Sequence, residues 1–209
     1  MTEFERVVRG RRMTRAFSPE PIEPDLLAEL VELASRAPSA GKTQGWHLLV
    51  LEGVDAHRYW DITFPAERRG GFAFPHLFDA PVIAIPLADP DAYVERYAEP
   101  DKARSGLGSG TDAWAAPYWT IDGSMAVMTL LLAAENAGRG ALFFGVFDHE
   151  PAVRAGFGIP DRLQVLGVLA LGWPHEGVGE TGRAGRSASR ARRAPDQIIR
   201  RGRWTEAGA

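Results

Sequence analysis

Cysteine is absent from the 209-residue sequence. Its absence excludes disulfides, thiolate metal sites, iron-sulfur ligation and cysteine nucleophiles together. Any redox chemistry would therefore have to be carried by a bound cofactor. Lysine is scarce as well, because only Lys42 and Lys102 are lysines among the 24 basic residues. A GC-rich genome would give this bias without any function, although arginine also differs in kind, since its planar guanidinium binds carboxylate or phosphate in a bidentate way and stays charged.

A strong charge and long apolar runs are also missing. The formal net charge is -3, which leaves no global positive field to attract nucleic acid or an anionic membrane. No window approaches the roughly 18 apolar residues of a membrane span, and the N-terminus is charged, without the apolar stretch of a secretory signal. A chain of this length with 45% hydrophobic residues buries most of its apolar surface in one core or two small ones. We expect one globular domain in a soluble, cytoplasmic protein.

The motifs of several catalytic classes are missing too. The five histidines are scattered without metal-ligand spacing, and no HExxH or His-x-His pattern occurs. No GxSxG motif places a serine nucleophile at a strand-to-helix turn. The GLGSG stretch at residues 106–110 has no predicted strand before it and no helix directly after it, so it does not fit a dinucleotide-binding turn. These absences argue against a metal centre, a serine hydrolase and a Rossmann-type site.

Continuous apolar runs predict a sheet that is covered on both faces. Four such runs are present, at residues 46–53, 80–87, 141–147 and 164–172. Helical spacing of apolar residues predicts an amphipathic helix over residues 24–37, which Pro38 stops. Pro151 is placed to begin a short helix over residues 151–158.

Three further segments do not fit a simple core. Residues 123–138 predict a helix that is apolar nearly all round, which is typical of a helix buried in a core or at a subunit interface. Residues 98–114 are rich in glycine and serine and predict a mobile loop. The stretch EGVGETGRAGRSASRARRAP, residues 176–195, holds no apolar side chain larger than Val178 and predicts an extended arm.

Arginines gather near both ends of the chain. One cluster lies within residues 6–15 and the other within residues 190–203. The clusters could be solvated surface, which is the usual fate of a charge run. Alternatively, members of both could converge on a phosphate dianion, where charge-assisted hydrogen bonds are about twice as strong as neutral ones. Spacing alone leaves both interpretations open.

The segment RAPSAGKTQGWHLLVL, residues 36–51, connects the amphipathic helix to a core strand, at a place where the backbone can come close to a planar ligand. Three other segments accompany it in order: RRMTRAF at residues 11–17, GRGALFFGVF at residues 138–147 and RRAPDQIIRRGRW at residues 192–204. Together these four segments, spread over nearly the whole chain, resemble the FMN-dependent nitroreductase family.

The resemblance implies an α+β fold, a nitroreductase-like three-layer sandwich whose central, mainly antiparallel sheet is flanked by helices. It also implies an intertwined homodimer with FMN at the subunit interface. Residues 1–175 would form the FMN-binding domain, and residues 176–209 would form a swapped C-terminal arm that embraces the partner subunit and adds a strand to its sheet. The apolar helix at residues 123–138 would then be a dimer helix.

The resemblance also implies three groups of cofactor-binding residues. Arginines from both ends of the chain would hold the FMN phosphate or ribityl chain, namely Arg11, Arg12, Arg15, Arg190 and Arg192 or Arg193. The segment between helix and strand would lie along the isoalloxazine ring through Pro38, Ser39 and Ala40, with Gln44 close by. Backbone contacts from the other subunit would come from Phe144 and Gly145.

The sequence departs from the family's pattern at three positions within the segments that carry the resemblance. Met13 stands where the family usually has serine, which removes a hydroxyl from the phosphate site. Lys42 replaces an asparagine, and Gly45 replaces a proline. Lys42 could pair with the electron-rich pyrimidine end of a reduced flavin and raise its potential, or it could point to solvent. Met13 and Lys42 are both kept as candidate cofactor-binding residues.

The activity implied is that of an oxidoreductase in which NAD(P)H reduces FMN, leaves, and is replaced by a nitroaromatic, a quinone or a similar acceptor. No catalytic acid or base is assigned, because the flavin would carry the hydride. Aromatic side chains outside the predicted strands are candidates to line the open face of the site: Phe72, Phe74, His76, Phe78, Trp114, Tyr118 and Trp119.

Three alternatives stay open at this point. Relatives of the same fold bind a deazaflavin, consume flavin with oxygen or dehalogenate aromatics, and the sequence selects none of them. A non-catalytic flavin-sequestering protein would also account for the changes at Met13 and Lys42. A nucleic-acid-binding module that uses the arginine-rich arm would need several phosphate contacts, and the negative net charge argues against it.

Overall fold

The computed structural model describes residues 1–177 and 189–204. Its centre is a sheet in the order β1-β2-β5-β3, with β4 paired to β2, and every pair of strands is antiparallel. The strands are β1 (Trp46–Glu52), β2 (Val82–Ala88), β3 (Gly140–Phe144), β4 (Gln164–Val165) and β5 (Val168–Gly172).

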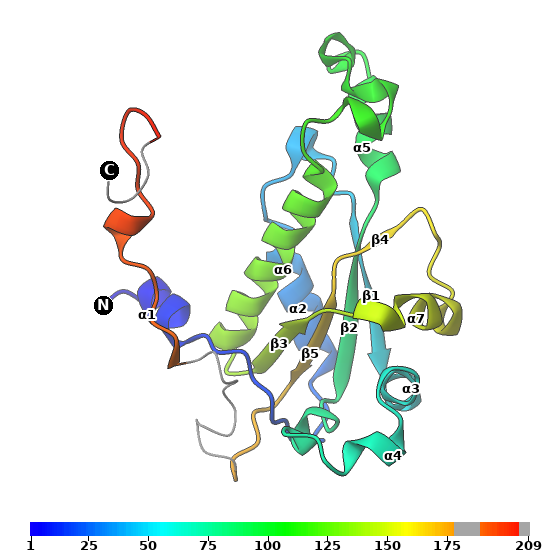
Figure 1. The fold of residues 1–209 in the computed structure, drawn as a ribbon, viewed down its shortest axis with the longest axis vertical. Coiled ribbons are helices and arrows are strands. Elements are labelled where there is room, and N and C mark those ends of the chain that lie inside the picture. The colour runs from blue at the N-terminus through cyan, green and yellow to red at the C-terminus, as the bar shows by residue number, and fades with distance from the viewer. Residues whose placement is uncertain (178–188, 205–209) are drawn as a thin grey trace.

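Helices cover both faces of the sheet, as Figure 1 shows. Two of them, α2 and α6, pack together on one face, and α3 and α7 lie on the other. The helices are α1 (Glu3–Gly10), α2 (Pro24–Ala34), α3 (Val54–Thr63), α4 (Ala66–Arg69), α5 (Pro90–Ala98), α6 (Tyr118–Asn136) and α7 (Glu150–Phe157). The predicted α+β, three-layer fold with an antiparallel sheet is therefore confirmed.

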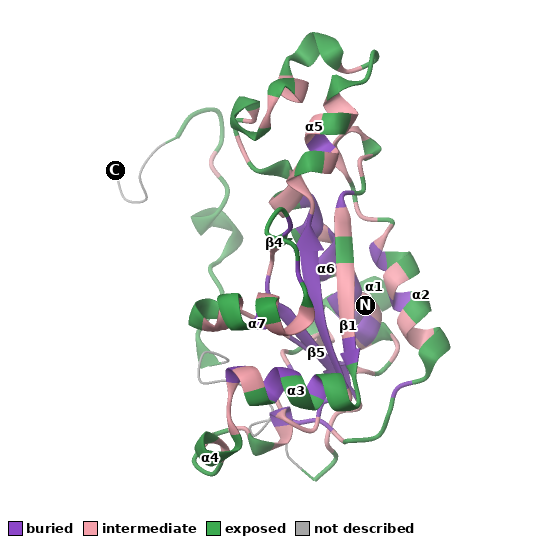
Figure 2. Ribbon diagram, turned by 90° about the vertical axis from the view of Figure 1, so that its right-hand side faces the viewer, coloured by how far each residue is buried: buried purple, intermediate pink, exposed green. Residues whose placement is uncertain are grey.

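The middle strand β2 explains why apolar runs rather than alternating patterns mark this sheet. All seven of its residues are buried (Figure 2). Successive side chains of a strand point to opposite faces, so Ile83 and Ile85 enter the core beneath α3 and α7, whereas Val82 and Ala84 enter the core beneath α2 and α6. Two apolar cores, one on each side of the sheet, follow from this single strand.

The run at residues 164–172 was predicted as one strand and is divided into β4 and β5. Both pieces pair with β2, and the break falls at Leu166 and Gly167. Gly167 has a φ of +151°, and a Cβ there would lie 2.6 Å from the ring of Phe143. The close approach requires glycine, because any side chain would collide with that ring.

Several helix boundaries differ from the prediction. The amphipathic helix α2 ends at Ala34, before residues 35–37, and α6 begins at Tyr118, five residues ahead of the predicted start at residue 123. Four helices were not predicted at all, namely α1, α3, α4 and α5. The start of α1 does carry a sequence signal, because Thr2 and Glu5 form a capping box.

Residues 98–114 were predicted as a mobile loop and instead form three short 3-10 turns packed beside α5. The indole Nε1 of Trp114 donates a hydrogen bond to the Leu107 carbonyl at 3.0 Å. Gly108 lies against the backbone of Ala98, where a Cβ would be 2.6 Å from the nearest atom. The glycines of this segment thus permit close packing and form no phosphate-binding turn after a strand.

The two ends of the chain differ in their contacts with the sheet. Near the N-terminus, Met13 forms a parallel bridge to Ala141 on β3, and Phe17 forms an antiparallel bridge to Pro174. Of the predicted arm, residues 189–204 extend away from the sheet and its helices (Figure 1), and residues 178–188 and 205–209 lie outside the described residues. Within the described residues, no helix combines the length and apolar character needed to cross a membrane.

Candidate functional site

The connection between α2 and β1 has an unusual backbone. Gly41, Lys42 and Gln44 have φ values of +62°, +54° and +54°. Residues other than glycine rarely adopt this left-handed conformation, which costs roughly 1–2 kcal/mol for each of them. Such a conformation persists only when surrounding contacts determine it. We call residues 38–45 the cofactor loop, after the role that the sequence predicts for them.

The buried carboxylate of Asp122, on α6, provides one of those contacts. Its Oδ2 accepts a hydrogen bond from the backbone N–H of Ala40 at 2.7 Å and another from the hydroxyl of Tyr93 at 2.8 Å. Asp122 is 4% exposed and Tyr93 is 1% exposed. Burial raises the pKa of the Tyr93 phenol, and the Asp122 carboxylate raises it further, so that Tyr93 remains a hydrogen-bond donor.

Helix α5 holds the cofactor loop from a second side. The Nε of Arg96 donates a hydrogen bond to the Gly41 carbonyl at 2.9 Å, while its two Nη atoms bind the Asp101 carboxylate at 2.8 Å each. The ring of Tyr97 leaves no room for a side chain at Gly41, since a Cβ there would be 2.8 Å away. Gly45 is confined in the same way by the ring of Tyr93, at 2.7 Å.

Inside the loop, Ser39 fixes the position of Gln44. The Ser39 Oγ accepts a hydrogen bond from the Gln44 backbone N–H at 2.8 Å. A hollow of about 520 Å³ opens beside the loop, and it is lined by Ser35, Arg36, Ala37, Pro38, Ser39, Lys42 and Gln44. The structure therefore brings together four of the predicted ring-binding residues around one hollow, with the Ala40 amide anchored behind them.

The predicted phosphate-binding arginines follow α1 and have different surroundings. Arg12 turns back, and its Nη1 donates to the carbonyls of Arg9 and Gly10 at 2.6 and 3.0 Å, so it caps the C-terminus of α1. Arg15 donates to the Met13 carbonyl at 3.0 Å. The Nη1 of Arg11 is buried and has no hydrogen-bond partner within the described residues. An unsatisfied buried guanidinium is costly unless an acceptor reaches it.

Met13, at the position of the expected serine, is partly buried and packs against both apolar cores. Met13 therefore supplies apolar contacts to both cores in place of the hydroxyl that a serine would have. Phe144 likewise directs its ring into the core, where it stacks on Trp60 with a centroid distance of 6.0 Å and an angle of 3°. Gly145 lies beneath the ring of Phe147, which a Cβ at Gly145 would approach to 2.8 Å. The backbone contact of Phe144 and Gly145 with the ring stays a prediction.

The arginines and the cofactor loop lie at opposite ends of α6. The loop is bonded to Asp122 near the start of the helix, and a Cβ on Gly10, at the end of α1, would lie 2.7 Å from the carboxylate of Glu135 near the end of the helix. Thirteen residues separate Asp122 from Glu135, which corresponds to about 20 Å along the helix axis. Figure 1 shows α1 beside the end of α6 that is remote from α5. One chain alone does not bring the two groups together.

Arg190, Arg192 and Arg193, the three predicted phosphate ligands of the C-terminal arm, are exposed, and the structure does not bring them to the cofactor loop. Arg190 and Arg192 have no contact that ties them to the sheet or its helices among the hydrogen bonds of the described residues, and Arg193 bonds the Gln197 carbonyl within the arm itself. Their predicted role stays a prediction.

The aromatic candidates divide into two groups. Phe72, Phe74 and Phe78 are partly buried and pack against the core on the α3 side, together with Phe64, and their place at the open face of the site stays a prediction. The ring of His76 lies 4.3 Å from that of His175 at a tilt of 35°, and its Nδ1 forms a hydrogen bond with Asp79 at 2.8 Å. The candidates of the second group, Trp114, Tyr118 and Trp119, lie next to the cofactor loop. They pack with Tyr93 and Tyr97 of α5 in one aromatic cluster.

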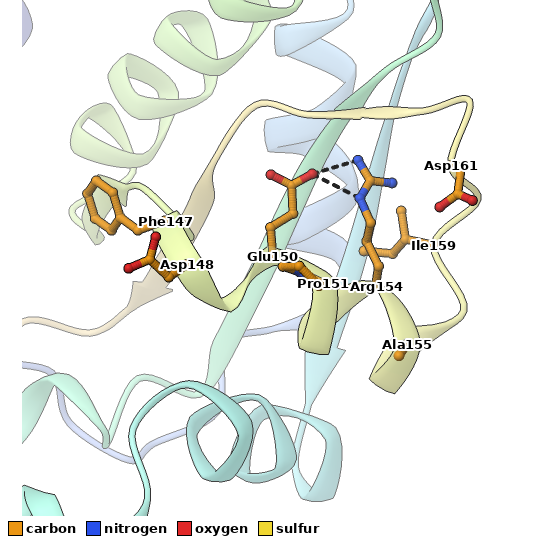
Figure 3. A pocket seen from close by; sticks show the side chains of 8 residues that line it. All are labelled: Phe147, Asp148, Glu150, Pro151, Arg154, Ala155, Ile159 and Asp161. Atoms are coloured by element: carbon orange, nitrogen blue, oxygen red, sulfur yellow. Dashed lines mark hydrogen bonds and ion pairs between the residues drawn. The ribbon is translucent and has the colours of Figure 1, made fainter.

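A larger hollow of about 840 Å³ lies elsewhere, at the start of α7 (Figure 3). Figure 3 shows Glu150 and Arg154 paired across one turn of the helix, and Arg154 also donates to the carbonyls of Pro160 and Leu163. The two Nη atoms of this guanidinium therefore hold the loop after α7, while its Nε bonds Glu150 within the helix. None of the predicted cofactor residues lines this hollow.

Sequence reasoning missed the residues that hold the cofactor loop in place. Asp122 carried a signal, because it is the one acidic residue near the start of an otherwise apolar helical run, and the predicted helix began one residue too late to include it. Tyr93 and Arg96 carried none, since they belong to a helix that was not predicted, and their importance comes from a contact with a distant segment.

The family pattern that matches this chain is that of the Nitroreductase family, over residues 8–173. The chain belongs to the nitroreductase family. It is 31% identical to an NADH dehydrogenase of Thermus thermophilus, over 79% of this chain and 84% of that protein. Among solved structures, a nitroreductase family protein of Streptococcus pneumoniae matches with a TM-score of 0.71 and 20% identity, covering 95% of this chain and 99% of that one.

A structure from Desulfovibrio desulfuricans, solved in complex with FMN, matches with a TM-score of 0.67 and 18% identity over 98% of this chain and 99% of that one. These likenesses confirm the nitroreductase-like fold. Membership of the family also identifies the chain as an oxidoreductase of a kind that typically binds flavin.

Proposed function

We propose that this nitroreductase binds FMN and transfers a hydride from NADH or NADPH, through the flavin, to a nitroaromatic, a quinone or a similar small acceptor. The observation that carries the proposal is the cofactor loop, whose left-handed residues are held by α5 and α6 around an open hollow. A strained loop that is fixed from two sides is typical of a ligand-binding segment. The FMN in the Desulfovibrio desulfuricans structure and the name of the Thermus thermophilus relative support the choice of cofactor and donor.

The residues present fit a flavin mononucleotide. The buried Nη1 of Arg11 lacks an acceptor, and neither Arg11 nor Arg15 forms an ion pair with an acidic residue in the described part of the chain. A phosphate would satisfy these donors. The flat segment from Pro38 to Ala40 would lie along the isoalloxazine ring, with Lys42 and Gln44 at the rim of the hollow.

When bound, FMN supplies a ring that accepts and returns a hydride. The tasks left to the protein are binding, orientation and electrostatics. Arg11 and Arg15 would anchor the phosphate, and the cofactor loop would fix the plane of the ring. Lys42 would place a positive charge close to the ring, which favours its reduced, electron-rich form. The aromatic group around α5 would offer the acceptor an apolar wall beside the loop.

We infer further that the working unit is a homodimer. The helix α6 carries a stripe of apolar residues at alternating spacings of three and four, which is the pattern of a helix-helix seam. Its members are Tyr118, Ile121, Met125, Met128 and Leu132. Three of them are well exposed although they are apolar, namely Tyr118 at 42%, Ile121 at 40% and Met128 at 42%. A second copy packed on this stripe would bury them.

The C-terminal arm would complete the dimer. Ile198 and Trp204 are exposed at 61% and 73%, which is unusual for large apolar side chains unless a partner covers them. Within the described residues, the outer edge of β1 pairs with no strand, and a hollow of about 600 Å³ with a mainly apolar lining lies between β1 and α2. The arm of one chain would add its strand at this edge of the other, so that residues 176–209 act as the swapped segment.

The test is the visible absorption spectrum of the purified protein, recorded first in air and then after anaerobic addition of NADH or NADPH. We expect a flavin band that bleaches with at least one nucleotide, and reoxidation by a nitroaromatic or a quinone. The variant Arg11→Gln should lose flavin, whereas Arg6→Gln, which removes an exposed α1 arginine paired with Glu3, should keep it. A flavin band that persists with both nucleotides would favour flavin sequestration, and no band after added FMN would refute the proposal.

A further inference from the structure

A buried charge without a counterion lies behind the cofactor loop. Asp122 is 4% exposed, and its carboxylate forms no ion pair within the described residues. Its two hydrogen bonds, from the Ala40 amide and the Tyr93 hydroxyl, end on the same oxygen. A buried carboxylate held only by neutral donors contributes little to stability compared with an apolar residue of similar size. Its presence therefore points to a role other than holding the core together.

The role is indicated by what the carboxylate contacts. Ala40 is the residue directly before Gly41, where the chain first turns left-handed. The bond to Asp122 fixes the peptide that precedes this turn, and the bond from Arg96 to the Gly41 carbonyl fixes the peptide that follows it. Both anchors reach the backbone only, so they set the path of the loop without occupying the hollow in front of it.

We propose that Asp122 is a positioning residue for the flavin: it holds the Ala40 amide, and through it the cofactor loop, in the conformation that receives the isoalloxazine ring. It also places a negative charge behind the ring site, opposite in sign to Lys42 on the same loop. A nearby negative charge disfavours the addition of electrons, so Asp122 lowers the flavin midpoint potential and Lys42 raises it. The roles toward the flavin rest on the proposed function, whereas the anchoring of the Ala40 amide by Asp122 is a property of the protein without FMN.

Two substitutions separate the charge from the hydrogen bonds. Asp122→Asn removes the charge and keeps a carbonyl oxygen that can accept from both Ala40 and Tyr93. Asp122→Leu removes both the charge and the acceptor at a similar volume. Tyr93→Phe keeps the carboxylate and removes one donor. Thr63→Val is the matched control, because Thr63 is a buried hydroxyl on α3 that bonds the Tyr59 carbonyl, outside the cofactor loop.

The first readout is amide hydrogen exchange in the FMN-free protein. In Asp122→Leu we expect the Ala40 and Gln44 amides to exchange at least about tenfold faster than in the wild type, because the loss of a charge-assisted hydrogen bond is of that size. Asp122→Asn should stay within a few-fold of the wild type, and Tyr93→Phe should fall between the two. Thr63→Val should leave both amides unchanged. Wild-type exchange in Asp122→Leu would overturn the anchoring role.

The second readout uses FMN binding and the flavin midpoint potential. Asp122→Leu should raise the FMN dissociation constant about tenfold or more. Asp122→Asn should bind FMN nearly as well as the wild type and should have a more positive midpoint potential, a change that a purely structural role would not cause. An unchanged potential in Asp122→Asn would refute the electrostatic role. If the wild type binds no FMN, the proposed function fails, while the exchange of the Ala40 amide still decides whether Asp122 anchors the loop.

Discussion

The close contact between Gly41 and Tyr97 gives a quantitative prediction for the stability of the cofactor loop. Gly41 has a φ of +62°, and a Cβ at this position would lie 2.8 Å from Cε2 of the Tyr97 ring. The substitution Gly41→Ala thus has two costs. An alanine in the left-handed region costs about 1 kcal/mol relative to glycine, and an added methyl group in a filled site costs about 1–3 kcal/mol more.

The ring of Tyr97 has little freedom to move out of the way. Its centroid is 4.7 Å from that of Trp114, and the ammonium of Lys102 lies 5.8 Å above its face. We therefore expect Gly41→Ala to lower the free energy of unfolding by about 2–4 kcal/mol. The FMN dissociation constant should rise as well, because the loop would be displaced even in the folded protein.

Gly106→Ala is the matched control for this prediction. Gly106 has a similar φ of +75°, but a Cβ there would meet nothing within 4 Å. Gly106→Ala should therefore lower the free energy of unfolding by the conformational cost alone, about 1 kcal/mol. Urea unfolding of both variants at one protein concentration measures the difference, since a dimer's stability depends on concentration. If Gly41→Ala is no less stable than Gly106→Ala, the packing of Tyr97 on the loop does not restrain it and the reasoning is wrong.

Three further predictions concern other parts of the chain. Arg12→Gln should lower the melting temperature by a few degrees through loss of the α1 cap, without the loss of flavin expected when a phosphate-binding arginine is removed. Met128→Asp should dissociate the homodimer in sedimentation equilibrium, whereas Leu33→Asp, at an equally exposed apolar position on α2, should leave it intact. The hydrogen bond from Arg96 lowers the pKa of Asp101, so the pair stabilises the fold above pH 4 and the effect is lost as the pH falls further. Asp101→Asn should therefore reduce stability more at pH 6 than near pH 2, as measured by unfolding at both values.

The sheet could be predicted from the sequence because burial on both faces leaves a strong local signal. The seven buried residues of β2 form an unbroken apolar run in the chain. The division between β4 and β5 could not be predicted in the same way, because it depends on the distance between Gly167 and the ring of Phe143. Helices α3 and α5 have mixed polar and apolar faces, and their packing against distant elements, rather than their own pattern, stabilises them.

The cofactor loop could be located from the sequence but not explained by it. The residues Ser39, Lys42 and Gln44 were expected to meet the ring through resemblance, and the structure gathers them at one hollow. The left-handed backbone at Lys42 and Gln44 left no trace in residue type, since neither is glycine. The hydrogen bonds that hold this backbone come from Arg96 and Asp122, which lie more than 50 residues further along the chain. Local patterns do not reveal such a contact.

The position of α6 connects the apolar helix, the distant arginines and the proposed dimer. The helix has the cofactor loop at one end and α1 at the other, with about 20 Å between them. In a dimer with twofold symmetry, both chains use the same surface. If two copies of the α6 stripe cross antiparallel, the loop end of one helix meets the arginine end of the other.

Each of the two resulting sites would combine the cofactor loop of one chain with Arg11 and Arg15 of its partner. This arrangement would bring together the two groups of predicted flavin-binding residues, which do not meet within one chain. It also predicts complementation: a mixture of Arg11→Gln and Asp122→Leu subunits would form heterodimers in which one site carries both substitutions and the other carries neither. Mixing two weakly binding variants should then restore wild-type FMN affinity at up to one site in each heterodimer, as measured by flavin titration. If each site were built within a single chain, mixing the two variants would restore wild-type FMN affinity at no site.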